Sequence, residues 1–212
     1  DAIRHAITKM SHLHFTSTEA YRKRVIQLGE QPDRVFNVGA LGVENVLKND
    51  FMSKEEIERS LNFMISDKCF LCTYHPVTLS NMSSETQVLN LLEALDDYQD
   101  HHIIFTYSNS DTNSQIIIKR IQEYVDKNQG RCMFIPSLGQ RRYFSALRYM
   151  TAVIGNSSSG IIEVPSFGIP TLDIGDRQKG RIAADSVIHC GYSKEEIKEG
   201  LKMVVAYGHK TI

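Results

Sequence analysis

Residues 152–160 read AVIGNSSSG and carry the clearest signal of the fold. The first three residues are apolar and suit a buried strand, and Gly155 allows the chain to turn sharply. Ser157 or Ser158 then falls where the N-cap of a helix belongs, and we expect that helix at 160–167. A buried strand followed at once by a helix is the repeating unit of parallel α/β sheets.

The serine-rich turn also has the chemistry of an anion site. Free backbone N–H groups at a helix start attract phosphate, and serine hydroxyls can donate beside them. Glu163 lies within the first two turns of the expected helix, where its carboxylate can accept from two ribose hydroxyls. The segment therefore predicts a site for the diphosphate and ribose of a nucleotide. The alternative is an ordinary capped loop, because serine caps are common.

A second strand, expected at 171–174, is followed by Gly175 and Arg177. In parallel α/β sheets ligands collect at the carboxyl ends of the strands, so Arg177 is predicted at the same edge as Ser157. A guanidinium can fork onto a diphosphate. A surface ion pair is the alternative role for Arg177.

Two more polar residues follow expected strands at 69–73 and 103–107. His75 can bond a phosphate or carry a proton near neutral pH; alternatively it is a loop histidine satisfied by the backbone. Asn109 is a candidate hydrogen-bonding partner of a sugar or base. The alternative there is a turn in which Asp111 caps the next helix.

Strand-like apolar runs alternate with helical patterns along most of the chain, which predicts an α/β fold with a doubly wound parallel sheet. Besides the strands already given, we expect strands at 13–15, 35–38, 132–135 and 187–189. Helices are expected at 2–10, 18–28, 54–63, 85–98, 114–127, 140–150, 160–167 and 194–206.

Composition narrows the class of protein. The chain has 212 residues, 42% of them hydrophobic, and a formal net charge of −1, which excludes a general nucleic-acid or membrane-surface binder. No apolar run approaches a membrane span and the N-terminus does not resemble a signal peptide, so a cytoplasmic protein is expected.

Cys69 and Cys72 have chelating spacing but would point to opposite faces of a strand. We expect neither a metal nor a cofactor.

Six segments in order carry a family resemblance: residues 4–15 (RHAITKMSHLHF), 39–45 (GALGVEN), 75–78 (HPVT), 109–111 (NSD), 137–140 (SLGQ) and 155–160 (GNSSSG). They resemble the hydrolysing UDP-N-acetylglucosamine 2-epimerases of sialic-acid biosynthesis. The resemblance implies a Rossmann-like fold and the C-terminal half of a two-domain, glycosyltransferase-B-type architecture. Residues 1–11 would be the last helix of an N-terminal domain, and residues 12–212 the UDP-binding domain, so we expect this chain to be a fragment.

The resemblance also implies roles for single residues. It implies that Ser157 and Ser158 bind the diphosphate, that Arg177 binds the phosphates and that Glu163 binds the ribose. His75 and Asn109 would lie near the phosphates and the sugar. Asp1 would border the sugar pocket. The family eliminates UDP from the sugar and then adds water, releasing N-acetylmannosamine. Its acid and base carboxylates belong to the N-terminal domain, so the fragment alone is expected to be inactive. The full-length protein is expected to be a homo-oligomer.

Several alternatives stay open at this point. A hydrolysing epimerase for a UDP-diacetamido-trideoxyhexose, as in legionaminic-acid pathways, would share the nucleotide residues. A glycosyltransferase of the same architecture and a non-catalytic UDP-sugar-binding module also remain. A non-hydrolysing epimerase is disfavoured, because Pro76-Val77-Thr78 stands where that branch has an arginine-rich continuation.

Overall fold

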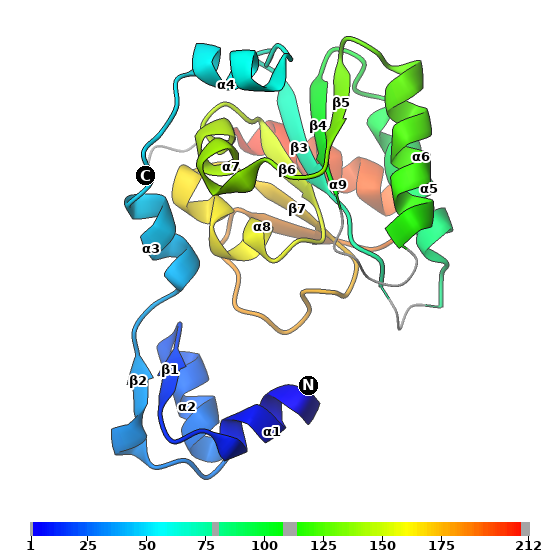
Figure 1. The fold of residues 1–212 in the computed structure, drawn as a ribbon. Helices are drawn as coiled ribbons and strands as arrows, with labels where there is room; N and C mark the ends of the chain where they lie inside the picture. Colours follow the sequence, from blue (N-terminus) through cyan, green and yellow to red (C-terminus); the bar gives the residue numbers. More distant parts are fainter. Residues whose placement is uncertain (1, 78–80, 108–113, 209–212) are drawn as a thin grey trace. The chain divides into compact units, whose positions relative to one another are not determined.

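The computed structural model describes residues 2–77, 81–107 and 114–208 (Figure 1). The chain divides into two compact units, Asp1–Lys48 and Asn49–Ile212. The expected boundary after residue 11 is a statement about the family's domains, and it stays a prediction.

The first unit holds a small parallel sheet. Strands β1 (His14–Thr16) and β2 (Val35–Asn37) pair in parallel, with His14 opposite Val35. Its other elements are α1 (Ala2–Met10), α2 (Glu19–Gln27), the 3-10 helix η1 (Pro32–Arg34) and α3 (Leu41–Leu47). Helix α1 has the predicted bounds. Helix α3 was not predicted, since Gly42 lies within it and Ala40 precedes it without a capping side chain.

The second unit is built on a six-stranded sheet in which each pair of neighbours is parallel. The order is β5-β4-β3-β6-β7-β8, so successive strands run outward to one side of β3 and then to the other. The strands are β3 (Cys69–Thr73), β4 (His102–Thr106), β5 (Cys132–Ile135), β6 (Ala152–Gly155), β7 (Thr171–Ile174) and β8 (Val187–Cys190). This is the Rossmann strand order, and it confirms the predicted doubly wound α/β fold.

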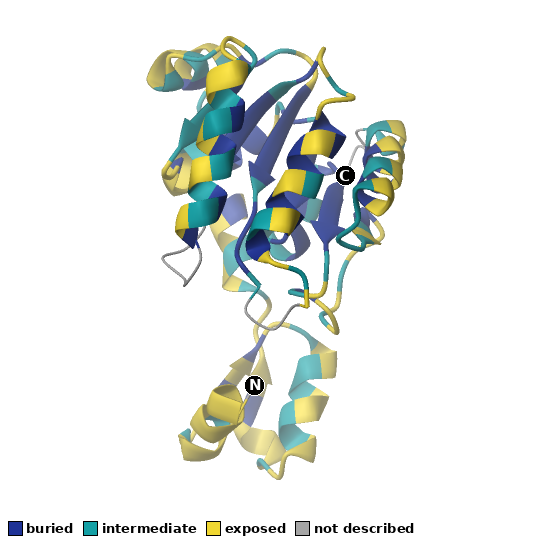
Figure 2. Cartoon of the chain, turned by 90° about the vertical axis from the view of Figure 1, so that its right-hand side faces the viewer, coloured by how far each residue is buried: buried dark blue, intermediate teal, exposed yellow. Residues whose placement is uncertain are grey.

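Helices cover both faces of that sheet (Figure 1). On one face, α5 (Ser84–Leu95) packs against α6 (Ser114–Lys127) and α9 (Lys194–Tyr207). The other face carries α4 (Lys54–Leu61), α7 (Gly139–Leu147), α8 (Ser159–Ile162) and the 3-10 helix η2 (Val164–Phe167). Figure 2 shows the sheet buried between the two layers, with the exposed residues on the outer sides of the helices.

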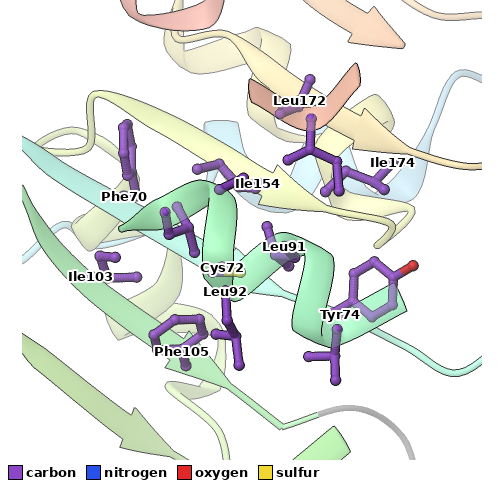
Figure 3. Packing of buried hydrophobic residues seen from close by; sticks show 14 of the residues in the cluster. Phe70, Cys72, Tyr74, Leu91, Leu92, Ile103, Phe105, Ile154, Leu172 and Ile174 are labelled. Atoms are coloured by element: carbon purple, nitrogen blue, oxygen red, sulfur yellow. The ribbon is translucent and has the colours of Figure 1, made fainter. Parts of the chain in front are cut away.

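Alternating residues of the strands build the core against α5, α6 and α9 (Figure 3). Phe70 and Cys72 of β3 lie in this cluster beside Ile154 of β6 and Leu172 of β7. Leu71, between the two β3 residues, points to the opposite face and is equally buried. Burial on both faces explains why these strands are nearly continuous apolar runs.

One predicted helix is different in the structure. The sequence predicts a single helix at 160–167, but α8 ends after four residues and η2 continues as a tighter 3-10 turn. Pro165 is the cause, because it has no N–H to donate and its ring conflicts with the carbonyl four residues earlier. The break separates the serine turn from Val164 and Ile169, which are both fully buried.

Across the described residues, no helix is long and apolar enough to cross a membrane.

Candidate functional site

The candidate site lies where the sheet reverses its winding direction. Strands β3 and β6 are neighbours there, with Thr73 opposite Gly155 at their carboxyl ends. His75 follows β3, the serine turn follows β6, and Arg177 follows β7. In open α/β sheets this reversal leaves a crevice that commonly holds the ligand.

The turn after β6 begins with Gly155, in a backbone conformation that favours glycine. Gly155 has φ +135°, a backbone conformation that L residues rarely adopt, and a Cβ atom there would collide with the main chain of Thr73. The close approach brings Asn156 N–H within 3.2 Å of Thr73 O. The predicted sharp turn is therefore present, and only glycine fits it.

Asn156 is completely buried and joins two segments of the site. Its Oδ1 accepts from the main-chain N–H of His75 at 2.7 Å, and its Nδ2 donates to the carbonyl of His75 at 2.8 Å. Its own carbonyl accepts from Arg177 Nη1 at 3.1 Å and from Gln178 Nε2 at 2.8 Å. The structure thus brings His75 and Arg177, two predicted site residues, onto one residue that the sequence did not single out.

The serine turn leads from Asn156 into α8. The sequence predicts Ser157 or Ser158 as the N-cap, and Ser158 occupies that position. Its side chain makes no capping hydrogen bond. The Oγ of Ser157 accepts from the N–H of Ser159 at 3.4 Å, which is a long hydrogen bond. Both Ser157 and Ser158 are half-buried. The hydroxyl of Ser158 is therefore not used in closing the helix end.

Glu163, at the end of α8, is also half-buried, and burial raises the pKa of its carboxyl. A hydrogen bond with Ser159 and one with its own backbone oppose this rise. Among the described residues, Oε2 of Glu163 is enclosed without a hydrogen-bond partner. A buried carboxylate oxygen that lacks a donor is costly, and a ligand hydroxyl would relieve that cost.

Tyr143 of α7 supports this part of the site and is not predicted from the sequence. Its hydroxyl lies 2.6 Å from Oγ of Ser159, so Tyr143, Ser159 and Glu163 form a chain of polar contacts. Burial raises the pKa of the Tyr143 phenol, so its proton stays available for hydrogen bonding. A single tyrosine within an amphipathic helix carries no signal of such a role.

A buried acid on β7 was also missed. Asp173 is 1% exposed, and its Oδ2 lies 2.9 Å from Nδ1 of His189 on β8. Burial raises the pKa of Asp173, while His189, Arg177 and Arg181 act in the opposite direction. Asp173 is therefore a buried acid that interacts with the two arginines of the segment after β7.

A cavity of about 650 Å³ lies beyond this loop. It is lined by the segment after β7, the segment after β8 and one side of α9. Gln178 lines it and also bonds Asn156, so the cavity adjoins the cluster around Asn156.

Two predicted site residues, Asp1 and Asn109, and the alternative helix cap Asp111 lie outside the described residues. Within the described residues, no group of three or more His, Cys, Asp or Glu side chains is placed to hold a metal ion. Cys72 packs in the core beside Phe70, whereas Cys69 is not part of that cluster, so the two thiols face opposite sides of β3 as predicted. Burial raises the pKa of Cys69 to about 12.

The model of the family described as UDP-N-acetylglucosamine 2-epimerase matches residues 1–211. The chain belongs to this family. With that match, the resemblance inferred from the six sequence segments is confirmed.

Named relatives support the same assignment. A GDP/UDP-N,N'-diacetylbacillosamine 2-epimerase (hydrolyzing) of Campylobacter jejuni is 42% identical over 188 residues, 89% of this chain and 49% of the relative. The polysialic acid biosynthesis protein P7 of Escherichia coli is 44% identical over 202 residues, 95% of this chain and 51% of the relative. The chain thus spans about half the length of these relatives.

The solved structure of S. aureus MnaA with UDP has the same fold. Its TM-score is 0.69 at 16% sequence identity, and the match covers 94% of this chain and 52% of MnaA. The Rossmann-like fold is confirmed by this likeness. Coverage of about half is what one half of a two-domain, glycosyltransferase-B-type architecture requires.

Proposed function

We propose that the full-length protein is a hydrolysing UDP-N-acetylglucosamine 2-epimerase, which converts UDP-N-acetylglucosamine and water into N-acetylmannosamine and UDP. The observation that carries the proposal is the convergence of His75 and Arg177 on Asn156 at the winding reversal of the sheet. It lies in a chain of this family. In this proposal the present chain binds UDP, the leaving group, and the carboxylates that transfer protons come from the other domain.

The predicted residues bind different parts of UDP. Ser157 and Ser158 donate hydroxyl hydrogen bonds to the diphosphate, and the Ser158 hydroxyl is not used for capping. Arg177 adds positive charge beside the phosphates. Glu163 accepts from the ribose hydroxyls, which would supply its enclosed oxygen with a donor.

His75 is the catalytic candidate of this chain. It is 6% exposed, and its main chain is held on both sides by Asn156. An imidazole beside the diphosphate would stabilise the negative charge that grows on UDP as the bond to the sugar breaks. Asn109 and Asp1 would complete the surroundings of the sugar.

The reaction runs in two balanced steps. Elimination removes the proton from C2 of the sugar and breaks the bond from C1 to UDP, giving an unsaturated sugar and UDP. Water then adds across the double bond, with hydroxide at C1 and a proton at C2 on the opposite face, giving N-acetylmannosamine. Neither oxidation nor reduction occurs overall, so no redox cofactor is needed.

A second substrate is favoured by the name of one relative. The C. jejuni relative is called a GDP/UDP-N,N'-diacetylbacillosamine 2-epimerase, which makes a nucleotide-linked diacetamido-trideoxyhexose the alternative substrate. The nucleotide grip would be the same for both substrates. A non-catalytic UDP-sugar-binding module is the third option.

The test is to incubate the full-length protein with each UDP-sugar and follow the products by NMR. We expect free UDP and N-acetylmannosamine from UDP-N-acetylglucosamine. Release of UDP from the diacetamido sugar alone would establish the alternative substrate. Intact UDP-sugar in both samples, despite measurable binding, would support the binding module and overturn the proposed activity.

Two matched variants sharpen the same test. His75→Ala should lower turnover by at least about a hundredfold, in the range expected for a group that assists proton transfer or charge stabilisation. His102→Ala is the control, because its ring bonds the carbonyl of Met64 at the opposite, amino end of the sheet. The 212-residue chain alone should bind UDP weakly without turning over substrate, and detectable epimerisation by it would contradict the assignment of roles.

We further propose a cytoplasmic location, since all four cysteines are free thiols and three of them are buried, as suits a reducing compartment. Homo-oligomerisation of the full-length protein also belongs to this proposal.

A further inference from the structure

We propose that Asn156 is the positioning residue of this site, which sets the geometry of His75 and of Arg177 together without touching the ligand. The inference rests on the proposed function, because it takes the two residues to be parts of a UDP site.

On the His75 side, hydrogen bonds from the side chain of Asn156 replace main-chain strand pairing. Strand pairing between β3 and β6 ends at Thr73 and Gly155, and the Asn156 N–H still reaches Thr73 O. Beyond that point Pro76 has no N–H to offer. The amide of Asn156 takes over, with one acceptor for the N–H of His75 and one donor for its carbonyl. Both bonds are fully buried, where competition from water is absent.

The other side of Asn156 fixes the loop after β7. Its carbonyl accepts two hydrogen bonds, from Arg177 and from Gln178, which uses both of its lone pairs. Gln178 is 2% exposed, so its side chain is held against Asn156 by packing as well as by the bond. Three strand ends therefore meet on one residue, and a shift of Asn156 would move His75 and Arg177 at the same time.

Only an amide of this length meets these demands. Aspartate has the same shape, but it would set a second acceptor against the carbonyl of His75 in place of a donor. Alanine would leave both main-chain groups of His75 buried without partners, which is costly for folding. The Asn156→Asp variant is therefore the sharper test, because it changes one atom of the contact.

The experiment measures two quantities in the full-length protein. Hydrogen–deuterium exchange by mass spectrometry follows the peptide that contains His75, and calorimetric titration gives the Kd for UDP. We expect Asn156→Asp to speed exchange in that peptide and to raise the Kd about tenfold or more, as the loss of one buried hydrogen bond implies. Gln178→Ala, the second variant if the first folds poorly, should raise the Kd about threefold by the same reasoning.

Asn128→Ala is the matched control. Asn128 also donates to a main-chain carbonyl, that of Tyr124, at 2.8 Å and also accepts from a neighbour, Arg131, but it lies after α6 at the amino end of the sheet. It should lower Tm without changing the Kd for UDP or the exchange of the His75 peptide.

The outcomes separate the two proposals. If the wild type binds UDP and Asn156→Asp binds it equally well, the positioning role is wrong, whatever the Tm. If the wild type does not bind UDP, the proposed function fails. In that case, unchanged hydrogen–deuterium exchange of the His75 peptide in Asn156→Asp would also refute the claim that Asn156 fixes the main chain of His75. Faster exchange would confirm that claim.

Discussion

Two buried regions of the second unit differ in what fills them. Under α5 the sheet is packed with apolar side chains such as Phe70, Leu91 and Ile154 (Figure 3). Just beyond the ends of β3 and β6, His75 and Asn156 are also buried but are joined by hydrogen bonds. The apolar region is held by close packing and tolerates substitutions that conserve side-chain volume. The polar region is held by hydrogen bonds, which depend on the direction of donor and acceptor. A small substitution there should therefore shift the geometry of the site and weaken ligand affinity.

The largest expected effect lies where the two regions meet. Gly155→Ala should lower the free energy of unfolding by about 4 kcal/mol or more, because the new Cβ collides with the main chain of Thr73 and the backbone is at positive φ. Gly130→Ala is the control, with φ +90° but open space around it, and should cost only about 1–2 kcal/mol. Urea denaturation measures both. Equal losses would show that the turn after β6 is not sterically fixed.

The next effect separates the apolar region from the surface. Leu91→Ala should lower the free energy of unfolding by about 3 kcal/mol, since Leu91 of α5 is fully buried in the core. Leu89→Ala, on the same helix but 37% exposed, should cost less than about 1 kcal/mol. Both variants should bind UDP as the wild type does. A weakened Kd in Leu91→Ala would mean that the two regions are not independent.

The smallest effect concerns pH and has opposite signs at two glutamates. Burial raises the pKa of Glu163, so the folded state holds its proton more tightly and this group destabilises the fold as pH rises above 4.5. Hydrogen bonds from Ser193 lower the pKa of Glu196, so this group stabilises the fold above its ordinary pKa and loses that contribution as pH falls through the lowered pKa.

Unfolding at pH 3, 5 and 7.5 tests both signs. Relative to the wild type, Glu163→Gln should gain stability as pH rises, and Glu196→Gln should lose it. Parallel pH profiles for the two variants would refute the assigned environments. Glu163→Gln should also weaken UDP binding, so a gain in stability would coincide with a loss of function.

The sequence predicts much of the fold because buried parallel strands are visible as short apolar runs. The bounds of β3, β5, β7 and α6 agree with the structure to the residue. The break at Pro165 was missed because a proline within a helical pattern leaves the type of the following turn open. Helix α3 was missed because its glycine and its uncapped start hide it.

The candidate site was less predictable than the fold. Serine, histidine and arginine after strands have recognisable ligand chemistry, so Ser157, His75 and Arg177 were found. Asn156 acts on the backbone of a neighbouring strand, and which strands are neighbours is not written in the local sequence. The same holds for Asp173, whose partner His189 lies on the next strand.

The central claim is that the carboxyl ends of β3, β6 and β7 form a UDP site, and the most direct test is calorimetric titration of UDP into the full-length wild type, Arg177→Ala and Arg131→Ala. Arg131 is also half-buried and bonds a main-chain carbonyl, that of His101, but it lies at the amino end of the sheet. We expect the wild type and Arg131→Ala to bind UDP with the same Kd, and Arg177→Ala to bind at least about tenfold more weakly, since charge-assisted bonds to phosphate are among the stronger ones. Equal affinity in all three proteins, or no binding by the wild type, would contradict the claim.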